Sequence, residues 1–80
     1  FDYIDLADGY SIYEIAPLDE WIGKSILDVN FRARYNLSII GVKNTDHTQI
    51  MPKADYVFRK EEHLMVIGKQ EDLNKMIRRR

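Results

Sequence analysis

The sequence predicts an α+β domain, a small mixed β-sheet with helices on one face. Residues 37–42 and 63–68 are short aliphatic runs of the kind that form buried strands. Residues 25–35 and 70–77 carry helix-start signals followed by spaced apolar residues. The segments alternate along the chain as strand, helix, strand, short strand, strand and helix, an order typical of one sheet covered by helices.

The composition sets limits on the size and class of the protein. Eighty residues form one domain at most and are close to the lower limit for a self-sufficient core. The chain has no cysteine, which excludes disulfides and thiolate metal ligands. The net charge of -1 argues against a nucleic-acid binder, and no apolar run approaches the roughly 20 residues of a membrane span. Because so small a core has no covalent staple, we expect a homodimer.

The first strand is predicted at residues 10–16, after an Asp-Gly turn signal. There Ser11 and Glu14 alternate with aromatic and aliphatic residues, as in a strand with one buried face, and Pro17 ends the run. The preceding residues 1–9 are interpreted as a linker or lead-in segment, although an additional early strand is also compatible with their pattern. Since the chain begins at a phenylalanine, we expect it to be a segment of a longer protein.

The first helix is predicted at residues 25–35. Ser25 and Asp28 have the spacing of a capping box, in which each side chain accepts a hydrogen bond from the backbone amide of the other residue. Asn30 is a second possible cap, so the segment is either one helix or two short ones. Asn36 stands where a left-handed residue would end the helix, a conformation that asparagine tolerates.

The second half of the chain supplies the remaining strands and the last helix. The strand at 37–42 is followed by a polar turn at 43–48 and a brief strand at 49–51, which a proline ends. The strand at 63–68 is too apolar to be an uncovered edge. The helix at 70–77 has acidic residues early and arginines after it, both favourable for the helix dipole.

The ionisable residues do not form a catalytic pattern. His47 lies in a predicted turn and His63 beside a strand, and neither has a nucleophile or carboxylate at a motif spacing, so the chain is not expected to be an enzyme. Asp2, Asp5 and Asp8 recur every three residues and could offer oxygens to a hard cation. Their spacing matches no calcium loop, so a solvated strand edge without a metal is the preferred interpretation.

Two arginines lie in the middle of the first predicted helix. Arg32 and Arg34 are two residues apart and point in different directions, so they do not act as one clamp. For Arg34 a solvent-facing position is expected. Arg32 lies next to Phe31, where it is either equally solvated or able to reach a phosphate while nearby aliphatic side chains cover a flat ring.

An ordered set of short motifs then resembles a known family. The chain has Gly-Lys-Ser-Ile before the first helix, an arginine three residues before a tyrosine, Pro-x-x-Asp, and a Leu-x-x-x-Gly strand followed by Asp-Leu. This order resembles the C-terminal regulatory domain of RCK proteins, the TrkA-C domain, over nearly the whole chain. The first fifteen residues are also similar to the segment that leads into this domain in cytosolic subunits of Ktr potassium transporters. The matching residues are Gly23, Lys24, Ser25, Ile26, Arg32, Tyr35, Pro52, Asp55, Leu64, Gly68, Asp72 and Leu73.

The resemblance implies a function and an assembly. Residues 1–80 would be one regulatory domain, dimeric and non-catalytic, in a gating subunit that controls a membrane potassium transporter of the Ktr or Trk type. The subunit would be cytoplasmic and held at the inner face of the membrane through the transporter, without inserting into the bilayer or binding nucleic acid. A ligand-free structural dimerisation module, with Phe31 and Met51 packing the seam, and a cation-binding regulatory domain remain alternatives.

The resemblance also implies a ligand. Cyclic di-AMP would bind across the twofold axis as a regulatory ligand, and no covalent cofactor is expected. Its contacts would be Ile26, Leu27, Asn30, Phe31, Arg32, Ser38 and Pro52. Arg32 of each copy would hold one phosphate, the apolar residues would enclose the adenines, and Asn30 and Ser38 would make polar contacts. The chain departs from the family pattern at Asn36, which replaces a glycine, and at Asn30, Phe31 and Ser38 of the ligand site.

Overall fold

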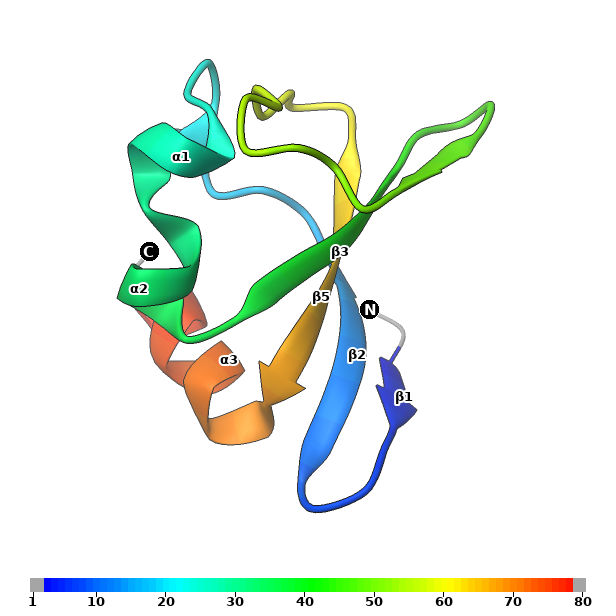
Figure 1. Cartoon of the computed structure of the whole chain (residues 1–80), viewed down its shortest axis with the longest axis vertical. Coiled ribbons are helices and arrows are strands. Elements are labelled where there is room, and N and C mark those ends of the chain that lie inside the picture. The colour runs from blue at the N-terminus through cyan, green and yellow to red at the C-terminus, as the bar shows by residue number, and fades with distance from the viewer. Residues whose placement is uncertain (1–2, 79–80) are drawn as a thin grey trace.

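The computed structural model describes residues 3–78, in which five strands form one sheet with the order β1-β2-β5-β3-β4 (Figure 1). The strands are β1 (Tyr3–Asp5), β2 (Tyr10–Ile15), β3 (Ser38–Lys43), β4 (Thr48–Ile50) and β5 (His63–Lys69). The helices are the 3₁₀ turn η1 (Asp19–Trp21) and the α-helices α1 (Ile26–Val29), α2 (Phe31–Tyr35) and α3 (Gln70–Arg78). Each strand and helix segment predicted above is present. The interpretation of residues 1–9 as a linker is wrong for Tyr3–Asp5, which form β1 and pair with β2. None of the helices within residues 3–78 is long and apolar enough to cross a membrane.

The α+β class is confirmed, with one difference in the sheet. All four strand pairings are antiparallel, so the sheet is not mixed. The expectation came from the strand–helix–strand order, which normally places two parallel strands side by side. Strands β2 and β3 do run in the same direction, but β5 lies between them and pairs antiparallel with both.

Alternation along the strands gives the sheet one buried face. Tyr13 lies opposite Val66 and Ile15 opposite Leu64, and all four side chains are buried. Helices α1, α2 and α3 lie together on one side of the sheet (Figure 1), as predicted. Burial of this apolar face against the helices is the main force that stabilises so small a domain.

A cluster of aromatic rings fills the space between η1, α2 and the loop before β5. Trp21 is fully buried, and its ring centroid lies 5.1 Å from that of Phe31 and 5.3 Å from that of Phe58. Its indole Nε1–H donates to the hydroxyl of Tyr35 at 3.0 Å, and that hydroxyl donates to Glu20 at 3.3 Å. The cluster therefore fixes α2 relative to η1 through both packing and a buried hydrogen bond.

The helical segment divides at an asparagine. The predicted capping box is present, since the Asp28 amide donates to Ser25 Oγ at 3.0 Å and the Ser25 amide donates to the Asp28 carboxylate at 3.3 Å. Asn30 has a left-handed backbone with φ of 55° and separates α1 from α2, so the interpretation as two short helices is the correct one. Asn36, with φ of 56°, ends α2 as predicted.

Candidate functional site

The start of α1 is held against the loop that follows β4. The Ile26 amide donates to the Tyr56 carbonyl and the Leu27 amide to the Ala54 carbonyl, each at 3.0 Å. The first amides of a helix have no partner within the helix, and here carbonyls of the turn at residues 53–56 accept from them. These bonds bring two predicted contact residues, Ile26 and Leu27, next to the segment that begins at Pro52.

The same loop is joined to the middle of β3. The Met51 amide donates to the Ile40 carbonyl at 2.9 Å. Strand β4 pairs only with residues 41–43, so the first half of β3, which begins at Ser38, has no β4 neighbour. The structure therefore places the segment at Pro52 between α1 and the middle of β3, whereas Ser38 lies two residues before Ile40 at the other end of the strand.

Large apolar side chains are exposed in this region. Leu27 and Met51 are each 70% exposed and Ile50 is 65% exposed, whereas Ile26 and Pro52 are half-buried. Met51 also has a positive φ of 57°, which is unusual for a residue with a long side chain. A group of exposed apolar side chains is typical of a surface that a ligand or a partner covers. Ile50 was not among the residues predicted from the sequence. It could have been recognised as an apolar residue on a very short strand, where burial within the sheet is not expected.

The loop itself is anchored by a polar cluster. The Tyr56 hydroxyl donates to Glu62 at 2.6 Å, and the Asn44 side-chain amide donates to the same carboxylate at 3.2 Å. The hydrogen bond from Tyr56 is the largest cause that holds the pKa of Glu62 below its ordinary value. Because Glu62 directly precedes β5, the cluster links the loop to the β3–β4 turn and to the sheet.

The two arginines of α2 differ in their surroundings. The guanidinium of Arg34 lies 3.9 Å from the Glu20 carboxylate and 5.2 Å from the centroid of the Tyr35 ring. The side chain of Arg32 is exposed and has no ion-pair or hydrogen-bond partner among residues 3–78. Arg32 is therefore a cation that can bind an anion without first giving up another contact. Asn30, at the junction of the two helices, is also exposed.

Phe31 lies apart from the other predicted contact residues. Its side chain is 2% exposed and packs edge-on against Trp21 inside the aromatic cluster. It thus supports α2 from beneath, and it does not reach the surface where Leu27 and Pro52 lie. The alternative interface seam of Phe31 with Met51 fails for the same reason, because Phe31 is enclosed in its own domain.

His63 and Asp5, two of the ionisable residues considered above, contact other side chains of the domain. His63 Nδ1 lies 3.0 Å from a carboxylate oxygen of Glu14, whose other oxygen lies 3.4 Å from Lys43 Nζ. Asp5 accepts a hydrogen bond from Ser11 at 3.0 Å, while Asp2 lies outside the described residues. Within residues 3–78 no group of three or more histidine or acidic side chains could hold a metal ion.

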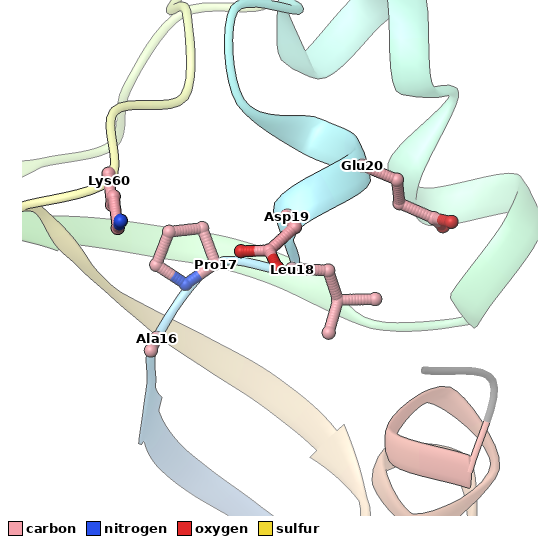
Figure 2. Close-up of a pocket in the computed structure, with 6 residues that line it drawn as sticks. All are labelled: Ala16, Pro17, Leu18, Asp19, Glu20 and Lys60. Carbon is pink, nitrogen blue, oxygen red and sulfur yellow. The ribbon is translucent and has the colours of Figure 1, made fainter.

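Two cavities lie elsewhere on the domain. One, of about 510 Å³, is next to η1 and appears in Figure 2. The other, of about 220 Å³, lies between α2 and α3 and includes Arg34 and Asp72. Neither of these cavities is lined by the contact residues predicted from the sequence. Of those residues, Leu27, Asn30 and Arg32 are exposed, whereas Phe31 is buried.

Comparison with known proteins settles the family. The TrkA-C domain model matches residues 10–79. The chain belongs to the TrkA-C domain family. It is 32% identical over 74 residues to Ktr system potassium uptake protein A of Bacillus subtilis (strain 168), covering 92% of this chain and 33% of that protein. It is 31% identical over 78 residues to Ktr system potassium uptake protein C of the same organism, covering 98% of this chain and 35% of that protein. The chain thus spans about a third of the length of these relatives.

Solved structures confirm the fold. The RCK C domain of the potassium transport protein KtrA, in complex with cyclic diadenosine monophosphate, superposes with a TM-score of 0.82 at 31% identity. The match covers 92% of this chain and 87% of that chain. An RCK_C domain dimer of S. agalactiae BusR superposes with a TM-score of 0.72 at 22% identity, covering 81% and 88%, and shares the fold. The resemblance to the TrkA-C domain and to Ktr proteins is therefore confirmed.

Proposed function

We propose that this domain senses cyclic di-AMP for a gating subunit that controls potassium uptake. The KtrA domain, 31% identical across 92% of this chain, was solved with that ligand. The observation that carries the proposal is the contrast between the two arginines of α2. Arg34 is engaged by Glu20, whereas Arg32 is exposed and unpaired among residues 3–78 and follows the helix that presents Leu27.

The ligand suits a twofold interface between two copies of the domain. Cyclic di-AMP has two phosphates and two adenines, and an isologous dimer presents the same patch twice. Arg32 of each copy binds one phosphate through charge-assisted hydrogen bonds. The apolar Ile26, Leu27 and Pro52 cover the adenines, and Asn30 and Ser38 contribute polar contacts. Phe31 acts from beneath by holding α2 in place.

Binding has to favour one arrangement of the dimer to regulate anything. A ligand shifts a conformational equilibrium only by its difference in affinity for the two states, and a near-complete shift needs about 5.5 kcal/mol. Residues 1–80 form a single non-catalytic domain in this scheme, within a longer cytoplasmic protein. A change in the relative orientation of the two copies passes through the rest of that protein to the membrane potassium transporter.

Calorimetric titration with cyclic di-AMP tests the proposal. Wild type is expected to bind one ligand per two chains. Each ligand loses two charged contacts worth about 1.5–3 kcal/mol apiece in Arg32→Ala, so the affinity is expected to fall by roughly 100-fold or more. Arg34→Ala is the matched control, because it removes the same charge two residues along the same helix, and its affinity is expected to stay close to wild type.

Three results contradict the proposal. One is the absence of binding heat with wild type, and a second is an equal loss of affinity in Arg32→Ala and Arg34→Ala. The third is a monomeric wild-type protein with ligand present, measured by analytical ultracentrifugation. A wild-type dimer that forms without binding the nucleotide would instead identify a ligand-free dimerisation module.

A further inference from the structure

A cavity of about 510 Å³ lies between the end of β2 and the loop before β5, away from the Arg32 surface (Figure 2). Its lining residues are Ala16, Pro17, Leu18, Asp19, Glu20 and Lys60. Pro17 and Leu18 are buried and form an apolar floor. Asp19 and Lys60 are exposed and bring one negative and one positive charge to its walls. Its volume is in the range of pockets that hold small molecules.

The two acidic residues of the cavity have different surroundings. Figure 2 shows the carboxylate of Asp19 turned towards the Pro17 ring, with Lys60 on the other side of that ring and Glu20 pointing away. The Glu20 carboxylate is already occupied, because it accepts from the Tyr35 hydroxyl at 3.3 Å. Across residues 3–78, neither Asp19 nor Lys60 forms an ion pair, with each other or with another side chain. The cavity thus offers two separated, unpaired charges of opposite sign.

The backbone at both charges is held by the core. Asp19 begins η1, whose last residue is the fully buried Trp21. Lys60 lies in a turn over residues 59–62 that one backbone hydrogen bond of 3.2 Å closes, directly after the buried Phe58. The rings of Trp21 and Phe58 are in contact, with centroids 5.3 Å apart. The spacing of the two backbones is therefore fixed before any ligand arrives, which lowers the entropy cost of binding.

We propose that this cavity binds a small zwitterion, a molecule with a primary ammonium and a carboxylate, such as a free amino acid or a dipeptide. The ammonium lies at Asp19, the carboxylate at Lys60 and the aliphatic body on Pro17. A ligand of a single charge leaves one wall of the cavity unpaired, whereas a zwitterion satisfies both. The proposal does not depend on the binding of cyclic di-AMP.

An NMR titration of the isotope-labelled chain tests the proposal. L-leucine and glycyl-L-leucine are the probes, and N-acetyl-leucine and leucine amide are controls that each lack one of the two charges. Binding in the millimolar range is expected, because the site is open to water. The amide signals of Leu18, Asp19 and Lys60 are expected to move with the zwitterions and much less with the singly charged controls. The tighter of the two probes shows whether the span of the site fits an amino acid or a dipeptide.

Matched variants separate the site from nonspecific binding. Asp19→Asn and Lys60→Gln are each expected to weaken zwitterion binding by up to about fivefold, the range for one exposed charge pair. Glu71→Gln removes an exposed carboxylate on α3 that does not line the cavity, and it is expected to leave the affinity unchanged. The same spectra show whether each variant is folded. The proposal is overturned if the zwitterions move none of these signals, if the controls move them equally, or if Glu71→Gln weakens binding as much as Asp19→Asn.

Discussion

Removal of a single oxygen from the aromatic cluster should destabilise the domain markedly. Tyr35→Phe deletes the hydroxyl that accepts from the indole Nε1–H of Trp21 at 3.0 Å and donates to Glu20 at 3.3 Å. Trp21 is fully buried, so its N–H would have neither a protein partner nor water. An unsatisfied buried donor costs about 1–3 kcal/mol, and the loss is expected in this range although the apolar contacts of the ring are kept.

Urea unfolding measures this effect directly. Trp21 is the only tryptophan of the chain, so its fluorescence reports the unfolding transition without labels. In a domain of this size a loss of 1 kcal/mol corresponds to a fall of about 4–8 °C in the melting temperature. Tyr10→Phe is the control, because it removes the same atom from a side chain that is 44% exposed. A change of less than about 0.5 kcal/mol in Tyr35→Phe, equal to that of the control, would refute the assigned role of the buried hydrogen bond.

Three further predictions follow from backbone geometry, charge and packing. Met51→Gly should raise stability in urea by about 0.5–1 kcal/mol, because φ is +57° and glycine avoids the left-handed strain, and an unchanged or lower stability would contradict this. Folding lowers the pKa of Glu62 from its ordinary value of 4.5. The ionised carboxylate therefore contributes to the free energy of unfolding above pH 4.5, and this contribution is lost as the pH falls through the lower pKa of the folded state. Unfolding measured across this acidic range should therefore show a weaker pH dependence in Glu62→Gln, and an equal slope would show that another group is responsible. Gly68→Ala should cost about 1–3 kcal/mol by crowding the buried Leu37, whereas Gly41→Ala, where the nearest atom lies at 3.4 Å, should be much better tolerated in the same urea assay.

Local signals in the sequence predicted the local structure well. The capping box at Ser25 and the left-handed Asn36 depend on residues within one helical turn, and both are present. Asn30 was expected as a possible cap, but it has a left-handed backbone and its side chain makes no capping hydrogen bond. The sheet order was not predictable in the same way. Strand β5 lies between β2 and β3. This position depends on contacts between segments that are far apart in the sequence, and no residue close by in the sequence specifies it.

The aromatic cluster shows a second limit of sequence reasoning. Trp21 stands in an acidic stretch that reads as a polar turn, yet it is the centre of the core. The resemblance implied that Phe31 and its neighbour Arg32 both face the ligand, yet successive residues of a helix point in different directions and Phe31 faces inwards. An apolar residue next to a candidate binding residue is therefore a weak guide to the binding surface.

The availability of a cation for a ligand is also decided by tertiary neighbours. Arg32 and Arg34 have the same charge, lie in the same helix and are both exposed, so residue type alone does not distinguish them, and it is the resemblance to the family that selects Arg32. The structure places Glu20, which lies in η1, within 3.9 Å of Arg34 and holds η1 there through the buried Trp21. Binding of a phosphate by Arg34 would have to compete with this carboxylate, whereas Arg32 has no such competitor among residues 3–78. The core residue Trp21 thus helps to determine which of two surface arginines is free to bind an anion, which is why the arginine pair is the sharpest test of the proposed sensor.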